Sequence, residues 1–262
     1  MLEPTPYADL NGVLVELTAG VRQILAANFV GAYLVGSFAV GDADVHSDVD
    51  FVVVIETQLT KDQQSALQAL HERLFALDVP WAQHLEGSYI PRDVLRSVEH
   101  ERTQLFYFDN GSTKPAWDDH CNTAVVRWSL REHGIVLAGP DPIALVEPVA
   151  PEALRGEALL AAPEYASWSR EPGMSRWKQP YLVLSLCRVL RTIDSGRVVS
   201  KREAGEWAIG ALDPAWADLI QAALDDRPDP WQRVHQAADV ERAERTRAFV
   251  DYAVAQAQNA AV

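Results

Sequence analysis

The sequence predicts an α/β domain over residues 1–150, followed by an all-helical domain over residues 151–262. In the first part, short runs of β-forming residues alternate with amphipathic helical patterns, which is typical of an α/β unit. After Pro151 no strand pattern remains and helical periodicities dominate. A chain of 262 residues is long enough for two modest domains, each with its own core. We therefore place the domain boundary near Ala150.

The chain is expected to begin with a helix and two strands. Apolar residues recur at three- and four-residue steps between Tyr7 and Asn28, which predicts an amphipathic helix. Ala32–Val35 and Phe51–Ile55 are runs of β-formers. The second run is apolar on both faces, so we expect a central strand that is covered on two sides.

Four more elements are expected before residue 150. In chain order they are a helix, a strand, a helix and a strand: Lys61–Leu77, Trp81–Ile90, Asp118–His133 and the "IVLAG" run, residues 135–139. Gly87 interrupts the first of these strands, and Gly134 is expected to end the second helix. The stretch from Pro91 to Pro115 is polar apart from "LFYF" and contains an "NGS" turn signal, so it is expected to be irregular.

The second domain is expected to contain four helices: Tyr181–Ile193, Lys201–Leu212, Pro214–Leu224 and Trp231–Ala255. Ser195-Gly196 is expected to end the first of them. The segment "APEYASWSREPGMSRWKQP" is broken by proline and glycine, which predicts a connection between helices.

Charge and cysteine content limit the possible partners. The 37 acidic and 23 basic residues leave a formal charge of -14, which disfavours a nucleic-acid partner and favours a cationic one. Cys121 and Cys187 lie far apart in apolar segments, so we expect buried thiols and neither a disulfide framework nor a metal cluster. No leader or membrane-spanning run is evident, so we expect a cytoplasmic protein without a membrane partner.

The stretch "GSFAVGDADVHSDVD", residues 36–50, contains the pattern with most chemistry. Gly36-Ser37 at a strand-to-helix turn would direct backbone N–H groups toward an anion such as phosphate. Asp48 and Asp50 are two residues apart, so both point to one face of a strand with Cα atoms about 6 to 7 Å apart. Such oxygen ligands suit Mg²⁺ bound to a nucleotide's phosphates. The alternative is that these are turn glycines and strand-capping aspartates.

These residues match the pattern GSxxxGxxxxxSDxD at every defined position, so the stretch resembles the polymerase-beta-like nucleotidyltransferase superfamily. The resemblance implies a mixed sheet flanked by helices, two metal-binding aspartates and a third carboxylate on a neighbouring strand. Glu86 is the candidate for that carboxylate, and it could take a proton from an attacking hydroxyl. The alternative is a solvated strand residue. His84 is given no role.

Two later segments, "LREHGIVLAGPDP" and "YLVLSLCRVLRTIDSGRVVSKREAGEWAIGAL", resemble the aminoglycoside adenylyltransferases that modify streptomycin and spectinomycin. This resemblance implies that Arg188 and Lys201 face the triphosphate; without it they would be solvated helix-end charges. The chain departs from that family at Lys178, where an acidic residue is expected, and around Trp117. Five acidic residues remain open as contacts to the acceptor: Asp109, Asp118, Asp119, Glu164 and Glu171.

The expected function is transfer of AMP from ATP to a hydroxyl of an aminoglycoside-type antibiotic, with release of pyrophosphate. In this hypothesis Gly36, Ser37 and Ser47 hold the triphosphate with Arg188 and Lys201, while Asp48 and Asp50 bind Mg²⁺. Glu86 is the base. The alternatives are an adenylyltransferase acting on another small molecule or on a protein, and a non-catalytic nucleotide sensor. A template-dependent or CCA-adding polymerase is disfavoured because no basic stripe is evident.

Overall fold

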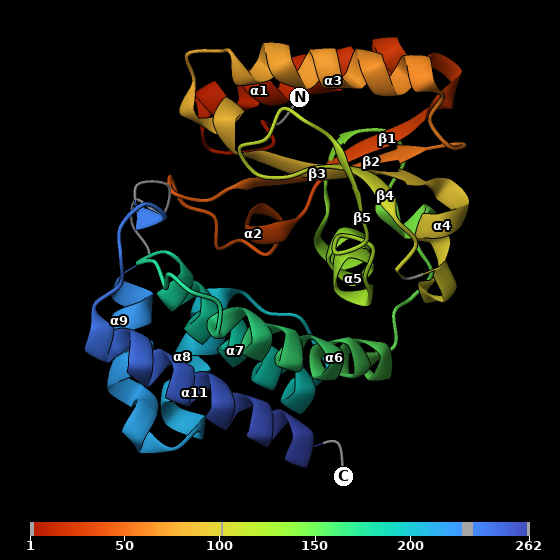
Figure 1. Cartoon of the computed structure of the whole chain (residues 1–262). Coiled ribbons are helices and arrows are strands. Elements are labelled where there is room, and N and C mark those ends of the chain that lie inside the picture. Colours follow the sequence, from red (N-terminus) through yellow and green to blue (C-terminus); the bar gives the residue numbers. More distant parts are fainter. Residues whose placement is uncertain (1–2, 101, 227–232, 261–262) are drawn as a thin grey trace. The chain divides into compact units, whose positions relative to one another are not determined.

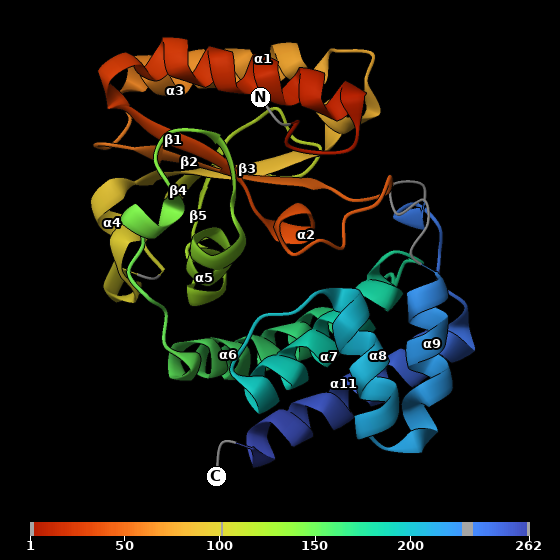
Figure 2. The same ribbon diagram turned by 180° about the vertical axis from the view of Figure 1, so that it is seen from behind.

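The computed structural model describes residues 3–100, 102–226 and 233–260. The chain separates into two compact units. The first comprises residues 1–43 and 47–149, and the second comprises residues 150–262 with residues 44–46. The first unit is a sheet with helices on both faces and the second is a group of packed helices, which Figures 1 and 2 show from opposite sides.

The first unit is built on a six-stranded sheet in the order β5-β4-β3-β2-β1-β6. Strands β2 and β3 are parallel, whereas all the other neighbouring pairs are antiparallel, so the predicted mixed sheet is confirmed. The strand bounds, in chain order from β1 to β6, are Phe29–Leu34, Val49–Ile55, Leu85–Pro91, Leu105–Phe108, Ala116–Asp118 and Ile135–Ala138.

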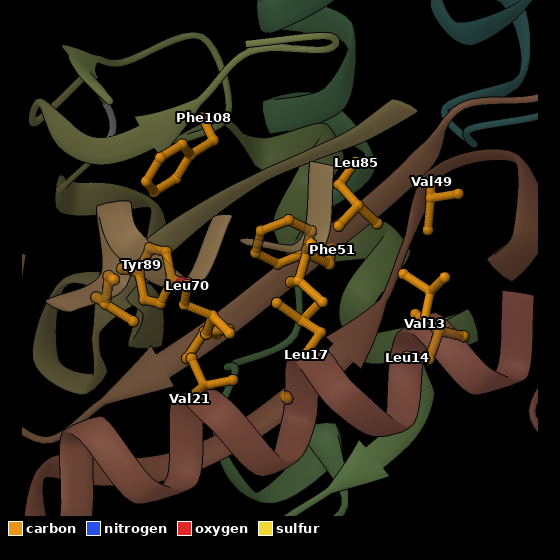
Figure 3. Close-up of a cluster of buried hydrophobic side chains, with 14 of the residues drawn as sticks. Val13, Leu14, Leu17, Val21, Val49, Phe51, Leu70, Leu85, Tyr89 and Phe108 are labelled. Atoms are coloured by element: carbon orange, nitrogen blue, oxygen red, sulfur yellow. The ribbon is translucent and has the colours of Figure 1, made fainter. Parts of the chain in front are cut away.

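Helices cover both faces of this sheet. Helices α1 (Ala8–Leu25) and α3 (Lys61–Phe75) lie on one face, and the short α2 (Gly36–Ala39), α4 (Arg92–Arg96) and α5 (Ala124–His133) lie on the other (Figure 1). Figure 3 shows the leucines and valines of α1 directed at the apolar residues of β2 and β3. Strand β2 alternates between the two cores, as predicted for a strand covered on both sides: its odd-numbered residues join the core under α1, and Val52 and Val54 join the opposite one.

Two expectations about the middle of the first unit are wrong. Residues 80–84 form a 3-10 turn, and the strand begins only at Leu85. Pro80 favours this turn because its ring holds φ near the helical value. The "LFYF" run and residues 116–118 are strands within the stretch that was expected to be irregular or helical. These two strands, β4 and β5, form a hairpin whose polar surroundings resemble a loop in the sequence. Pairing of β4 with β3 stabilises it.

The helix expected from Asp118 begins later. Helix α5 starts at Ala124, after the Thr123 side chain accepts a hydrogen bond from the Val126 backbone N–H. The Asn122 side chain donates to two backbone carbonyl oxygens upstream, at 2.9 and 2.7 Å. Residues 119–122 therefore form an anchored turn between β5 and α5.

The second unit contains helices α6 to α9 and α11: Pro151–Ser169, Lys178–Ser195, Lys201–Ala211, Ala217–Asp225 and Val240–Asn259. Gly196 ends α7 with φ of 67°, as predicted. Helix α6 runs through Pro163 to Ser169, so the first part of the expected connection is helical. Its buried alanines pack in the helical core, and this packing offsets the backbone hydrogen bond lost at proline.

The third predicted helix of this unit starts later than expected. Pro214–Trp216 is a 3-10 turn that precedes α9. The start expected at Trp231 lies outside the described residues, and α11 begins after Asp239, whose side chain caps it. Within the described parts of the chain, every helix is too short or too polar to cross a lipid bilayer.

Candidate active site

Asp48, Asp50 and Glu86 converge at the ends of two neighbouring strands. Asp50 lies near the start of β2, Glu86 near the start of the parallel strand β3, and the two are register partners. One carboxylate oxygen from each of the three residues lies within 4.8 Å of the other two. The parallel pairing is what brings a residue 36 positions away beside the DxD pair. Three hard oxygen ligands so close together fit a Mg²⁺ site.

The turn at Gly36 packs directly against Asp50. Gly36 has φ of +61°, and a Cβ atom there would lie 1.8 Å from Asp50 Oδ2. The Val35 backbone N–H also donates to the Asp50 carbonyl oxygen at 2.9 Å. Only glycine therefore allows both this backbone conformation and this close approach.

The Ser37 hydroxyl is buried and has no hydrogen-bond partner among the described residues. Leaving such a group without a partner is costly, so an unpaired buried hydroxyl is consistent with a position that a ligand oxygen completes. Ser47, the other serine of the predicted phosphate site, is buried directly before Asp48.

Glu86 is held by residues that the sequence analysis gave no role in catalysis. The Tyr107 hydroxyl lies 2.8 Å from Glu86 Oε1 and 2.9 Å from Asp109 Oδ1, so it can donate to either carboxylate. His120 Nε2 lies 3.5 Å from Glu86 Oε1, and His120 Nδ1 lies 2.5 Å from Asp118 Oδ1. Tyr107 could have been found from its two-residue spacing to the acidic candidate Asp109; His120 had no comparable signal.

The ionisation of this group follows from its contacts. Hydrogen bonds to Cys121 and then to Glu86 raise the pKa of His120 to about 11, so the ring is an imidazolium at neutral pH. Burial, followed by the negative charge of Glu86, raises the pKa of Tyr107 far above its usual range. Tyr107 is thus a neutral hydrogen-bond donor and His120 a local cation beside Glu86.

The predicted cationic residues lie on the second unit. Arg188 is half-buried on α7. Lys201 is the first residue of α8, and its Nζ lies 3.9 Å from the centroid of the Tyr181 ring. Lys178 is buried: its Nζ lies 3.2 Å from Glu171 Oε2 and 4.6 Å from the centroid of the Trp168 ring. The positive charge of Lys178 is therefore balanced by Glu171.

Two residues without an assigned role have evident structural contacts. His84 Nδ1 lies 3.2 Å from Asn110 Oδ1, and burial lowers the pKa of His84. Trp117 lies on β5 with its ring edge-on to that of Phe106. Neither belongs to the carboxylate cluster.

Comparison with protein families assigns both parts of the chain. Residues 19–105 match the family model described as "Nucleotidyltransferase domain", and residues 145–256 match "Aminoglycoside adenylyltransferase, C-terminal domain". Over both of its parts the chain is similar to the aminoglycoside adenylyltransferases. The predicted family and fold class are thereby confirmed.

Relatives of this adenylyltransferase-type chain match both parts of it. Spectinomycin 9-adenylyltransferase of Staphylococcus aureus is 26% identical over 226 residues, covering 78% of this chain and 79% of the relative. The aminoglycoside (3'') (9) adenylyltransferase of Shigella flexneri is 25% identical over 229 residues, covering 82% and 84%. Among solved structures, spectinomycin adenyltransferase AAD(9) from Enterococcus faecialis, crystallised with ATP and spectinomycin, has the same fold. It has a TM-score of 0.73 and 15% identity, and covers 94% of this chain and 98% of that one.

Proposed function

We propose that this protein transfers AMP from ATP to a hydroxyl of an aminoglycoside-type antibiotic of the streptomycin and spectinomycin class, releasing pyrophosphate. The observation that carries the proposal is the convergence of Asp48, Asp50 and Glu86 beside the Gly36-Ser37 turn. The relatives named for spectinomycin and aminoglycoside adenylyltransfer support the choice of acceptor.

The metal in this proposal is Mg²⁺, held by Asp48 and Asp50. The closely spaced carboxylate oxygens fit such an ion. Asp48 and Asp50 would hold this ion against the phosphates of bound ATP, where it would supply charge neutralisation for departure of pyrophosphate.

The chain's own residues bind and orient the reactants. The turn at Gly36 and Ser37, together with Ser47, is proposed to hold the triphosphate, and the unpaired Ser37 hydroxyl supplies a donor for a phosphate oxygen. Glu86 takes the proton of the acceptor hydroxyl as that oxygen bonds to the α-phosphorus and the bond to pyrophosphate breaks. The Tyr107 hydroxyl orients Glu86 through its 2.8 Å hydrogen bond.

We further propose that residues 1–150 and 151–262 act as two domains, the second supplying Arg188 and Lys201 as contacts to the triphosphate. A chain with net charge -14 needs local cations to bind a tetra-anionic nucleotide. Support comes from the match of residues 145–256 to the C-terminal domain of the family. We also propose that the protein acts in the cytoplasm, where ATP is available, and that it has no nucleic-acid partner.

A cationic acceptor is consistent with the charges near the proposed base. Asp109 and Asp118 lie in the hydrogen-bonded group around Glu86, on the same side of the sheet. Pairing of Lys178 with Glu171 also removes the repulsion that an unpaired lysine would exert on a cationic drug.

The test is pyrophosphate release from ATP and Mg²⁺ against a panel of streptomycin, spectinomycin and other aminoglycosides, with mass spectrometry of the product. We expect acceptor-dependent release and a product heavier by one AMP group. Asp50→Asn should abolish it without changing the circular dichroism spectrum. No release with any member of the panel, from a protein that binds ATP, would refute the antibiotic as acceptor. Near-wild-type turnover of Asp50→Asn would refute the metal assignment.

A further inference from the structure

A second group of potential metal ligands also includes Glu86. His120 and Cys121 follow β5 in the anchored turn, and one ligand atom each from Glu86, His120 and Cys121 lies within 4.8 Å of the other two. The sequence predicted a buried thiol at Cys121, but this residue is only partly buried and its side chain hydrogen-bonds to His120. Cys187, by contrast, is fully buried in the helical core, as predicted.

We propose that Glu86, His120 and Cys121 form a binding site for Zn²⁺ or a similar thiophilic divalent cation. Carboxylate, imidazole and thiolate are the three ligand types that zinc uses in proteins, and three protein ligands with one open position are typical of accessible zinc sites. With ligands at about 2.1 Å from the ion, neighbouring atoms of a tetrahedral site are about 3.4 Å apart. The 3.5 Å from His120 Nε2 to Glu86 Oε1 matches that spacing.

The residues around the ligands are arranged to orient them. Asp118 Oδ1 lies 2.5 Å from His120 Nδ1 and also accepts the His120 backbone N–H at 2.8 Å. A carboxylate on one ring nitrogen directs the other nitrogen toward a metal, as in carboxylate–histidine–zinc sites. The Tyr107 ring lies edge-on to the His120 ring, with centroids 4.3 Å apart, and its hydroxyl holds Glu86.

The charges at this position favour a cation. Three acidic groups, Glu86, Asp118 and Asp109, surround His120 and Tyr107. A divalent cation would replace the protons of the imidazolium and the thiol, and both protons would leave to solvent. The nitrogen and sulfur ligands separate this site from the all-oxygen group of Asp48 and Asp50, which suits Mg²⁺.

The two groups share Glu86, and this gives the site a consequence that rests on the proposed function. A carboxylate that coordinates Zn²⁺ is a weaker base, because the cation draws electron density from it, so it accepts the acceptor's proton less readily. Zinc bound at Glu86, His120 and Cys121 therefore inhibits AMP transfer while Mg²⁺ and ATP are present.

The binding test uses Co²⁺ as a spectroscopic probe and Zn²⁺ as its competitor, with a reductant that is not a thiol. We expect thiolate-to-cobalt charge-transfer absorption in the wild type and in Cys187→Ala, the matched control at the chain's only other cysteine. Cys121→Ser should lose this absorption and bind Zn²⁺ at least about 10-fold more weakly. Asp118→Asn should weaken Zn²⁺ binding about 10- to 100-fold by removing the orienting carboxylate.

The site is refuted if the wild type shows no such absorption, or if Cys121→Ser with a native circular dichroism spectrum binds Zn²⁺ as tightly as the wild type. In the activity test, Zn²⁺ should inhibit pyrophosphate release by the wild type and by Cys187→Ala, and much less by Cys121→Ser. Equal inhibition of all three would refute the shared-ligand mechanism. The cobalt spectrum does not depend on turnover. A protein that fails to use any acceptor in the panel can therefore still show the metal site, and the failure of one proposal is distinguishable from the failure of the other.

Discussion

The contact between Gly36 and Asp50 makes a strong prediction about Gly36→Ala. The new methyl group would start 1.8 Å from Asp50 Oδ2, whereas ordinary contacts begin at 3.4 Å, so the carboxylate or the turn must move by about 1.6 Å. A misplacement of about 1 Å at a reacting centre can reduce the rate about 100-fold. We therefore expect kcat/KM for AMP transfer to fall at least about 100-fold. The positive φ adds a stability cost of about 1 kcal/mol.

Gly111→Ala is the matched control. Gly111 also has a positive φ, +76°, but a Cβ there would meet nothing closer than a backbone oxygen at 3.8 Å. Gly111→Ala should therefore melt about 2 to 4 °C lower than the wild type and Gly36→Ala at least as much lower, because the clash adds to its cost. Only Gly36→Ala should lose transfer. Pyrophosphate release and thermal melts on the same preparations measure the two effects. If Gly36→Ala turned over as fast as Gly111→Ala, the close packing of the turn on Asp50 would have no catalytic importance.

Four other variants test the proposed base, the hydroxyl proposed to orient it, and the core of the first unit. Glu86→Gln should still bind ATP and acceptor but lose at least about 100-fold in turnover, because it cannot accept the proton. Tyr107→Phe should lower kcat about 10-fold with little change in KM, because a hydrogen bond to a charged group contributes about 1.5–3 kcal/mol. Arg127→Met should lower the free energy of unfolding by at least about 3 kcal/mol, because the buried guanidinium donates to three backbone carbonyls and to a side-chain oxygen. Burial lowers the pKa of His71 to about 3, whereas a histidine in the unfolded chain binds a proton below about pH 6.5. The folded state should therefore lose stability as the pH falls below about 6.5, and the unfolding equilibrium constant should rise up to about tenfold per pH unit. His71→Gln should lack this contribution to the pH dependence.

Each of these variants has a control and a contradicting result. Glu56→Gln changes an exposed glutamate and is the control for Glu86→Gln, so it should turn over like the wild type. Arg73→Met changes an exposed arginine and is the control for Arg127→Met, so it should be as stable as the wild type. Tyr33→Phe, which removes a tyrosine hydrogen bond to a distant carbonyl, should keep full turnover. Unchanged turnover in Glu86→Gln or Tyr107→Phe would remove that residue's role. If Arg127→Met were as stable as the wild type, the hydrogen bonds of Arg127 would not stabilise the core. If stability depended on pH equally in the wild type and in His71→Gln, the lowered pKa of His71 would not contribute to it.

Local patterns were sufficient for most helices of the chain. The periodicity of α1, α3, α7 and α8 matches the predicted helices closely, because one apolar stripe must pack on a core. The strands of the β4–β5 hairpin were missed because they are short, lie among polar residues and depend on pairing with β3. Helix α6 was missed because Pro163 normally ends a helix, and only packing within the helical core overrides that preference.

The sequence by itself determined the DxD pair, the glycine-serine turn and the family, because these residues are close together and their spacing alone specifies their shared face. Only the tertiary structure decided which residues contact Glu86. The parallel pairing of β2 with β3 places Glu86 beside Asp50, and the β4–β5 hairpin brings Tyr107, His120 and Cys121 to it. These contacts join residues that are 21 to 36 positions apart in the sequence. The pairing of strands in a sheet is non-local, so it cannot be predicted from the periodicity of a single segment.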